Sequence, residues 1–372
     1  MSSTGAYFLP TELLLLITSY LGPLDQISLL QVFPGIAGLF NHQQFAATDE
    51  NGDTILHLQA RAKTTADGSG DTEASLDPPF FPALLVCNEG TSLHPQNRDG
   101  DTPLLEAACV GNIPFMKLLL EKDPVGLNIA NNHGVTPLWS AVLTKNTAAI
   151  SLLLEQPNIS VNHEMTEGED NDAHQITPFL HALWHGWGDY DVVSLLIKHP
   201  ETDLAFPDAS GMTPIHLAID QGRENLVRDM LVTGRLDVNI TGGRGHTPLH
   251  HAVAGRRGNV RIVKLLLAQD GIDVNRPTDT GETPLMRSRS PRCMKRLLAH
   301  PGIEIDRVDD FGWSALGYVA YQGDMNCAQV LLRHGARPVQ VDLDGYTPRD
   351  RAEQANHAEM VKLLQSFMDR QK

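Results

Sequence analysis

The segment Thr247-Pro248-Leu249-His250-His251-Ala252 carries a pattern that recurs along this chain of 372 residues. The dipeptide Thr-Pro returns mostly at steps of 34 to 41 residues, and a degenerate copy, Ser314-Ala315, divides one longer step. A self-similar period of this size indicates a stack of supersecondary units, each in contact only with its neighbours. Because a stack presents a long surface, we expect a binding protein. The nine copies begin at Thr54, Thr102, Thr136, Thr177, Thr213, Thr247, Thr283, Ser314 and Thr347.

The copy that starts at Thr213 predicts a turn followed by two helices. Gly211 suits a turn that needs a positive φ, and the hydroxyl of Thr213 can cap the next helix. Pro214 fits the first helical position, where a missing N–H costs nothing, and Gly222 ends the helix. Apolar residues at helical spacing are Ile215, Ala218 and Ile219 in the first helix, and Leu226, Val227, Met230 and Leu231 in the second.

This unit resembles the ankyrin repeat, whose signature is T-P-L-H-x-A, and residues 247–252 match that signature at every position. The resemblance covers about residues 49–370, within an expected repeat domain over 46–372. It implies an all-α solenoid of helix pairs, with short turns projecting as fingers and a concave face where protein partners dock. The signature histidines His57, His216 and His250 are then structural, and Trp139 takes the same position in its copy.

Two steps between copies are longer than the period. Residues 64–77 are rich in Thr, Ala, Asp, Gly and Ser, a composition that cannot bury apolar surface, and we expect a disordered loop there. Residues 164–174 carry five carboxylates and no Lys or Arg. A solvated finger loop, an acidic docking loop and a metal-binding loop all remain open for this segment, although its spacing does not fit an EF-hand.

The copy at Thr283 is damaged, because its first helix meets Ser288, Ser290 and Pro291. A proline inside a helix costs about 3 kcal/mol or more, so we expect the helix to stop before Pro291. Since the stability of a repeat stack depends on neighbouring contacts, this is the expected breaking point. We therefore predict that proteases cleave the folded protein near residues 287–292, before they cleave other repeats.

The net charge of −16 argues against nucleic acid or an anionic membrane as a partner. Residues 244–296 are the exception, with eleven bases, four acids and a local charge of +7. This stretch is either a seat for an acidic or phosphorylated partner, which Arg side chains bind through paired hydrogen bonds, or a solvated basic surface.

The cellular compartment is inferred from the cysteines and from apolar runs. Four cysteines lie far apart without CxxC spacing, which is typical of a reducing compartment. No apolar run approaches the ~18 residues that span a bilayer, and no secretory signal is expected. We expect a cytoplasmic or nuclear protein, monomeric outside its complexes.

We find no pattern that predicts catalysis, a cofactor or a metal. The sequence has no G-x-S-x-G motif and no kinase motifs, and Gly242-Gly243-Arg244-Gly245 lacks the Gly-Lys-Ser/Thr of a P-loop. His181 and His185 could share a helix face, but two histidines without further ligands indicate a metal only weakly. We expect a protein that is not an enzyme.

Recognition is expected at positions that the repeat leaves free, at the finger turns and at the ends of the first helices. Aromatic residues and arginine dominate binding hot spots. At each aromatic position, packing between repeats is the alternative. The candidate partner-binding residues are Trp184, His185, Arg256, Arg257, Phe311, Trp313, Tyr321 and Tyr346.

Residues 1–45 lie outside the repeat and resemble an F-box, a short helical module. The match is the order Leu-Pro-x-Glu-Leu at residues 9–13 followed by Gly-Pro-x-Asp at 22–25, and Phe33-Pro34-Gly35 interrupts the expected third helix. Together with the repeats, the chain resembles fungal F-box/ankyrin proteins. The resemblance implies that these apolar residues bind a Skp-type adaptor: Leu9, Pro10, Leu13, Ile17, Leu21, Ile27, Leu30 and Val32.

The F-box resemblance implies a substrate-recognition subunit of a Skp-cullin-F-box ubiquitin ligase, with a protein substrate on the concave face. The alternative is a plain ankyrin-repeat scaffold whose N-terminal helices only cap the stack. Apolar helices are needed in both cases, because burying their faces contributes about 25 cal/mol per Å², whether a partner or the stack covers them.

Overall fold

The computed structural model describes residues 16–18, 20–32, 46–62, 92–167, 174–185, 190–254 and 258–370. The chain divides into two compact units, Met1–Thr202 and Asp203–Lys372. The boundary after Thr202 reflects how the helices pack. The boundary expected after residue 45 reflected where the repeat pattern starts in the sequence. The expected disordered loop at 64–77 lies outside the described residues.

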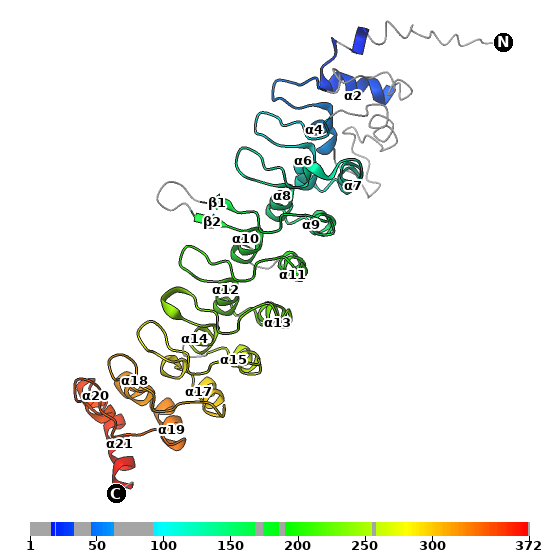
Figure 1. Cartoon of the computed structure of the whole chain (residues 1–372). Helices are drawn as coiled ribbons and strands as arrows, with labels where there is room; N and C mark the ends of the chain where they lie inside the picture. The colour runs from blue at the N-terminus through cyan, green and yellow to red at the C-terminus, as the bar shows by residue number, and fades with distance from the viewer. Residues whose placement is uncertain are drawn as a thin grey trace, which may run out of the picture. The chain divides into compact units, whose positions relative to one another are not determined.

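A helix begins directly after each expected start residue, and the helices form pairs (Figure 1). In unit 1, the first helices are α4 (Ile55–Ala60), α6 (Pro103–Val110), α8 (Pro137–Leu143) and α10 (Pro178–His185), and the second helices are α7 (Ile113–Lys122), α9 (Thr147–Leu154) and α11 (Tyr190–Lys198). The short 3-10 helix η2 (Pro124–Asn128) follows α7.

In unit 2, the first helices are α12 (Pro214–Asp220), α14 (Pro248–Val253), α16 (Pro284–Arg287), α18 (Ala315–Gln322) and α20 (Pro348–Gln354). The second helices are α13 (Glu224–Val232), α15 (Val260–Leu267), α17 (Pro291–Leu298), α19 (Met325–Arg333) and α21 (Ala358–Arg370), and η4 (Gly243–Gly245) is a short 3-10 turn. Within each unit, every first helix packs against the next first helix, and the second helices form a parallel row.

The finger turns are built by a buried polar residue and a glycine. In the turn before α12, the carboxylate of Asp208 accepts hydrogen bonds from the amides of Ser210 and Met212, both at 2.8 Å. Gly211 has φ of 77°, the left-handed conformation that the sequence predicted. The turn before α18 repeats this arrangement, with Asp309 accepting from the amides of Phe311 and Trp313.

The signature histidines are structural, as the sequence predicted, and they link neighbouring copies. Nδ1 of His216 accepts a hydrogen bond from the amide of Thr213, so the proton lies on Nε2, which donates to the carbonyl of His246 in the next turn at 3.0 Å. The hydroxyl of Thr213 lies 2.8 Å from Nδ1 of His216, and the two residues form a capping box at the start of α12. Nε2 of His250 contacts the carbonyl of Glu282 in the same way, at 3.1 Å.

In other copies, another residue occupies the histidine position. Trp139 is such a residue, and it keeps the hydrogen bond to the next finger turn. Trp139 is fully buried, and its Nε1 donates to the carbonyl of His163 at 2.7 Å. In this copy, the hydroxyl of Thr136 accepts from the amide of Trp139, which is the cap expected of this position. Trp139 is therefore structural, as its place in the pattern predicted.

The damaged copy stops where the sequence predicted. Helix α16 has four residues and ends at Arg287, and α17 begins at Pro291, where proline occupies the first helical position. The connecting residues Ser288 and Ser290 are buried. The expected cleavage near residues 287–292 stays a prediction, and the burial of these two side chains opposes it.

The acidic segment forms more regular structure than the expected loop. Strand β1 (Met165–Glu167) pairs antiparallel with β2 (His174–Ile176), with Met165 opposite Ile176. Ile176 is fully buried, which anchors the hairpin next to the cap residue Thr177. The intervening residues 168–173 lie outside the described ranges.

The N-terminal helix α2 (Pro23–Val32) packs against α4, the first repeat helix of unit 1. Leu30 is only 2% exposed, and Gln26 donates to the carbonyl of Leu21 at 3.0 Å. The structure thus joins this helix to the repeats. In the ranges that the structure describes, no helix is long and apolar enough to cross a membrane.

Candidate functional site

Exposed apolar side chains gather at the last repeats of unit 2. Among the described residues of that unit, every exposed large apolar side chain except Val232 lies between residues 308 and 346. The amide of Leu343 donates to the carbonyl of Phe311 at 3.1 Å, so two neighbouring finger turns present these side chains together. Phe311 is 59% exposed and Leu343 is 79% exposed. We name Phe311, Trp313, Tyr321, Leu343 and Tyr346 the aromatic face.

Arg351 on α20 holds the aromatic face in place. Its guanidinium lies 4.5 Å from the ring centre of Trp313 and 4.7 Å from that of Tyr346, within the range of cation–π attraction. The same guanidinium donates to Asp342 at 2.6 Å and to Asp344 at 2.5 Å. Burial opposes ionisation of Asp342, yet the hydrogen bonds from Arg351 and from the amides of Tyr346 and Asp344, together with the charge of Arg351, outweigh burial and lower the pKa of that carboxyl. The two aromatic rings are therefore fixed before any partner binds.

Tyr318 on α18 connects the aromatic face to a group of carboxylates. Its ring lies 5.2 Å from that of Trp313, and its hydroxyl contacts Asp309 at 2.6 Å and Glu282 at 3.0 Å. Burial, together with the hydrogen bond to Asp309 and the charge of Glu282, raises the pKa of the Tyr318 hydroxyl. Tyr318 therefore stays neutral and donates its proton to these carboxylates.

The sequence found most of this face and missed part of it. Of the expected partner-binding residues, Phe311, Trp313, Tyr321 and Tyr346 come together; Trp313 is half-buried and the other three are exposed. Trp184 is half-buried in unit 1, the side chain of His185 is not described, and Arg256 and Arg257 lie outside the described residues. Leu343 and Arg351 were missed. An apolar residue between Asp342 and Asp344 in a finger turn was an available signal.

The expected adaptor-binding residues are placed only in part. Ile17 is exposed, Leu21 is half-buried and Leu30 is buried. Leu9, Pro10 and Leu13 lie outside the described residues, and so do the side chains of Ile27 and Val32. The exposed apolar side chains of this segment include Leu16, Tyr20 and Leu24, none of which was singled out for adaptor binding.

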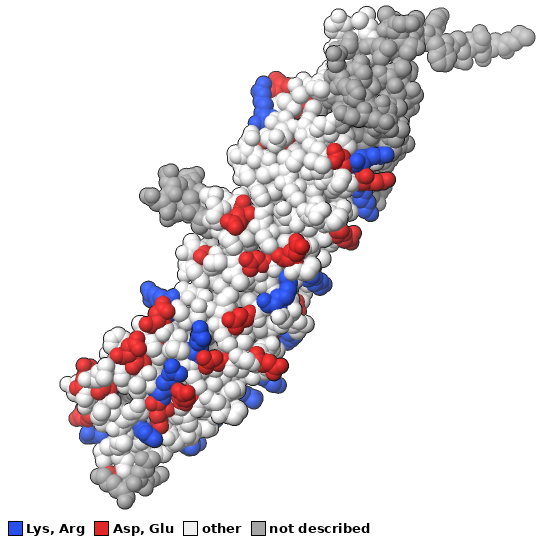
Figure 2. Space-filling view, viewed as in Figure 1, with Lys and Arg blue, Asp and Glu red and all other residues white. Residues whose placement is uncertain are grey.

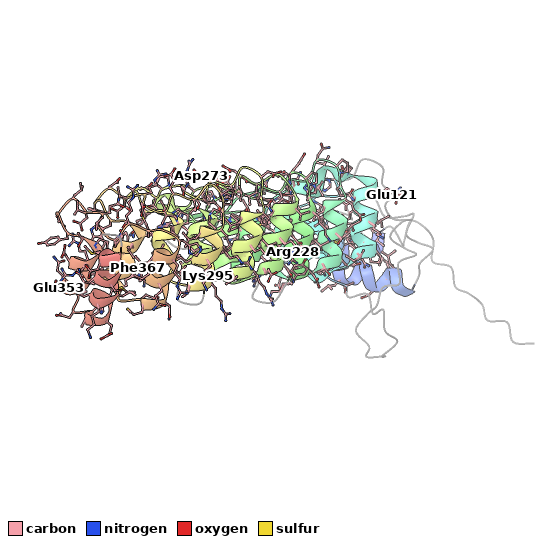
Figure 3. The ribbon with its side chains drawn as sticks, turned by 90° about the horizontal axis from the view of Figure 1, so that it is seen from below. Glu121, Arg228, Asp273, Lys295, Glu353 and Phe367 are labelled. Atoms are coloured by element: carbon pink, nitrogen blue, oxygen red, sulfur yellow. The ribbon has the colours of Figure 1, made fainter. Side chains whose placement is uncertain are left out.

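The described bases of the stretch 244–296 are divided between first helices, second helices and the segments that connect them. Five of its bases lie exposed on the second helices: Arg261 and Lys264 on α15, and Arg292, Lys295 and Arg296 on α17. Lys295 on α17 is labelled in Figure 3. Arg287 instead ends the first helix α16, and Arg289 lies in the connection between α16 and α17. On the face drawn in Figure 2, acidic and basic side chains are interspersed.

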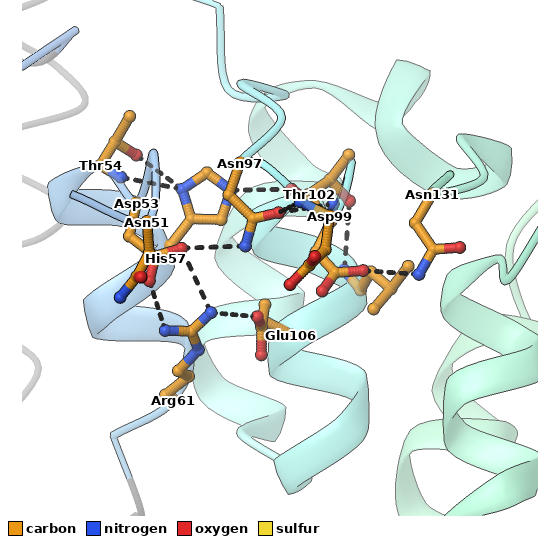
Figure 4. A network of polar contacts seen from close by, with 12 residues as sticks. Asn51, Asp53, Thr54, His57, Arg61, Asn97, Asp99, Thr102, Glu106 and Asn131 are labelled. Atoms are coloured by element: carbon orange, nitrogen blue, oxygen red, sulfur yellow. Dashed lines mark hydrogen bonds and ion pairs between the residues drawn. The ribbon is translucent and has the colours of Figure 1, made fainter. Parts of the chain in front are cut away.

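A polar network in unit 1 has a structural role (Figure 4). Arg61 donates to Asp53 at 2.5 Å and also pairs with Glu106 in the next copy. Burial raises the pKa of the Asp53 carboxyl, but hydrogen bonds from Asn97 and Arg61 outweigh burial and lower it. Every member of this network has a partner within the repeats, so the network locks neighbouring copies together and leaves no group poised for chemistry.

The structure gives no support for a metal site in the ranges it describes. They contain no group of three or more His, Cys, Asp or Glu side chains that could hold a metal ion. The surface features that remain are the aromatic face and the charged side chains near it, which suit the binding of another protein.

Family models match most of the chain. A model described as ankyrin repeats (3 copies) matches residues 75–165, 227–309 and 287–370, and a model described as ankyrin repeat matches 210–242. Ankyrin repeat proteins are generally non-catalytic and act as protein-binding scaffolds.

Three similar proteins illustrate the range of chains that carry such repeats. Ankyrin repeat protein nuc-2 of Neurospora crassa is 26% identical over 203 residues, 53% of this chain and 18% of its own length. Tyrosine-protein kinase HTK16 of Hydra vulgaris is 29% identical over 161 residues, 42% of this chain and 21% of its own. Alpha-latrotoxin-Lg1a of Latrodectus geometricus is 34% identical over 107 residues, which are 28% of this chain and 8% of its own length. The matches thus span only a minor part of each of these relatives.

Proposed function

Because the chain belongs to the ankyrin repeat family, we propose that it is a non-catalytic adaptor whose aromatic face holds a protein partner. The observation that carries this proposal is the gathering of exposed apolar side chains between residues 308 and 346. An exposed apolar surface gains about 25 cal/mol per Å² when a partner covers it.

The fixed geometry of the aromatic face supports the proposal further. Trp313 and Tyr346 are held by Arg351, so little side-chain entropy is lost when a partner binds. Trp, Tyr and Arg are also the residues that most often dominate binding energy at interfaces. Phe311 and Leu343, which are more exposed, would then make the outer contacts.

Selection of short peptides from a random displayed library, with the full chain as bait, tests the aromatic face. Phe311→Ala combined with Leu343→Ala should weaken the selected peptides about tenfold or more, since each loses a buried contact. The matched control is Val232→Ala, which removes an exposed apolar residue of the same unit outside the face. Peptides that bind the double variant as well as the original chain would reject this surface.

We also propose a finer function, in which residues 1–45 bind a Skp-type adaptor and make the chain the substrate-recognition subunit of a ubiquitin ligase in the cytoplasm or nucleus. The ordered match at residues 9–13 and 22–25 supports it. The exposure of Ile17 and of its neighbours Leu16 and Tyr20 is in keeping with a helix that a partner covers.

A pull-down with a purified Skp-type adaptor tests the ligase function. The full chain should retain the adaptor, and Leu9→Ala, Pro10→Ala and Leu13→Ala together should abolish retention. Melting curves of both forms control for folding. If the unmodified chain fails to bind the adaptor, the ligase function is rejected, while the aromatic face remains to be judged by its own experiment.

A specific observation favours a second candidate, a plain repeat scaffold capped by its N-terminal helices. Helix α2 packs against α4, and Leu30 on α2 is buried, as a cap requires. Leu30→Ala should then lower the melting temperature, because a buried Leu→Ala change costs about 2–5 kcal/mol. The same change would leave the melting temperature unaltered if α2 served only to bind an adaptor.

A further inference from the structure

The shortened helix of the damaged copy leaves a hollow in unit 2. The hollow has a volume of about 320 Å³ and is lined by Ala254, Glu282, Arg287, Arg289, Tyr318 and Gln322, together with Met286. Its walls include the cap residue of α14 and the last residue of α18, which flank α16 on either side. The hollow thus lies among the ends of three first helices.

The sequence of the damaged copy explains the hollow. Helix α18 continues for eight residues after its cap, whereas α16 continues for only four. The turn that α16 lacks would fill space between its two neighbours, and Ser288 and Ser290 turn inward instead. The residue at the end of the short helix, Arg287, and the next exposed residue, Arg289, therefore line an open space.

The charges in the hollow leave one cation in excess. Nη1 of Arg287 lies 3.2 Å from a carboxylate oxygen of Glu282, and the other oxygen of Glu282 accepts from the hydroxyl of Tyr318 at 3.0 Å. Arg289 is exposed, and no carboxylate of the described residues lies within ion-pair distance of it. Among the lining residues that the structure describes, two arginines and one glutamate give a net charge of +1.

The hollow is continuous with the aromatic face through one residue. The hydroxyl of Tyr318 contacts Glu282 in the hollow, and the ring of Tyr318 packs beside Trp313 at 5.2 Å. A single peptide segment on the aromatic face can therefore place a neighbouring side chain beside Arg287 and Arg289.

We propose that the hollow left by the shortened helix α16 receives the carboxylate of an Asp or Glu side chain from the protein partner, paired with Arg289 and Arg287. This rests on the proposed binding of a partner to the aromatic face. Guanidinium groups bind carboxylates through paired, charge-assisted hydrogen bonds. One carboxylate balances the net charge of +1 on the described lining residues, whereas a phosphate carries ≈ −1.5 to −2 and exceeds that charge.

Peptide selection with a charge reversal tests the proposal. Peptides selected on the unmodified chain should share an Asp or Glu at one fixed position, and Arg289→Ala should weaken them about tenfold, the loss of a 1.4 kcal/mol pair. On Arg289→Glu, the same selection should favour Lys or Arg at that position. Arg292→Ala is the matched control, because Arg292 is an exposed arginine of the second helix α17, outside the hollow.

The outcomes separate this inference from the proposed function. If the selected peptides depend on Phe311 and Leu343 but share no acidic position, the proposed carboxylate site in the hollow is wrong. The proposed binding of a partner to the aromatic face is then still supported. The carboxylate site would also be wrong if peptides with a shared acidic position bind more weakly to Arg292→Ala but not to Arg289→Ala. Tighter binding after phosphoserine replaces the acidic residue would assign the site to phosphate instead. Failure to select any peptide would count against both proposals.

Discussion

The neighbouring copies that begin at Thr247 and Thr283 differ at two positions of the signature, where Met286 replaces the histidine and Ser288 the alanine, and in the length of the first helix. In the first, His250 is fully buried and spans from Thr247 to the carbonyl of Glu282 in the next turn. In the second, Met286 takes the histidine position, and its sulfur contacts only the amide of Thr283, at 3.2 Å. In the intact copy, the polar side chain at the signature position bonds to the next copy. In the damaged copy, two arginines line an open hollow instead.

The comparison teaches where recognition can arise in a repeat. Positions that follow the signature are buried and already paired, so they have no capacity left for a partner. Departures from the signature leave side chains that the stack does not use. The following predictions test this contrast, from the largest expected effect to the smallest.

Acidification should destabilise the histidine-containing copies. Burial lowers the pKa of His216 to about 4 and that of His250 to about 3. The folded protein binds fewer protons than the unfolded chain, so this stability is fully present above pH 6.5 and is lost as the pH falls toward 4. At pH 5, the two histidines should together cost about 4 kcal/mol of unfolding free energy.

Urea unfolding at pH 7 and at pH 5 measures this loss. His250→Gln, which cannot titrate, should lose about 2 kcal/mol less between the two pH values. Met286→Leu provides the comparison in the damaged copy, and its pH dependence should equal that of the original chain. If the unfolding free energy falls by the same amount between pH 7 and pH 5 in all three proteins, His250 does not cause the acid destabilisation.

Removing the hydrogen bonds of His250 in the intact copy should lower the unfolding free energy more than changing Met286 in the damaged copy. His250→Ala should lower the unfolding free energy by about 3 kcal/mol, because it leaves the amide of Thr247 and the carbonyl of Glu282 without partners. Met286→Leu should cost less than about 1.5 kcal/mol, as a volume-conserving change does. Urea unfolding at pH 7 checks both, and equal losses would show that the link is dispensable.

Trp139 is the informative intermediate case, because it keeps the link without being a histidine. Trp139→Phe should cost about 2 kcal/mol, from a lost hydrogen bond to the carbonyl of His163 and some lost packing. The loss should not vary between pH 5 and pH 7, since indole does not titrate there. Melting curves at the two pH values measure it, with Trp184→Phe as a control tryptophan in the same unit.

Pro291→Ala should have the smallest effect. Pro291 stands at the first position of α17, where proline is well tolerated, so its removal mainly increases the freedom of the unfolded chain. We expect a loss below about 1 kcal/mol. Crystallography of the variant checks whether α16 still ends at Arg287. A lengthened α16 that fills the hollow would identify Pro291 as the residue that breaks the helix.

The sequence predicted local features well, because they depend on residues close together in the chain. Threonine and serine start residues, turn glycines and the end of α16 all follow from backbone preferences within a few positions. The histidine role was also predictable, since the signature places it one turn after its threonine. The hairpin at Met165–Ile176 was missed, because its charged residues resemble those of a solvated loop.

Tertiary structure alone determined how distant residues meet. Arg351 lies between rings of residues 313 and 346 because neighbouring finger turns are stacked at the repeat spacing. The basic stretch is continuous in sequence, yet successive helices carry its side chains to different rows, and among its described bases Arg287 and Arg289 line the hollow.

By itself, the sequence determined the repeat, its caps and turns, and the place where one helix fails, since each depends on backbone conformation over a few residues. Only the packing of neighbouring copies decided what that failure produces. The space left by the missing turn is defined by α14 and α18, which belong to the preceding and following copies and pack against α16. A hollow is a property of three helices together, and no single segment encodes it.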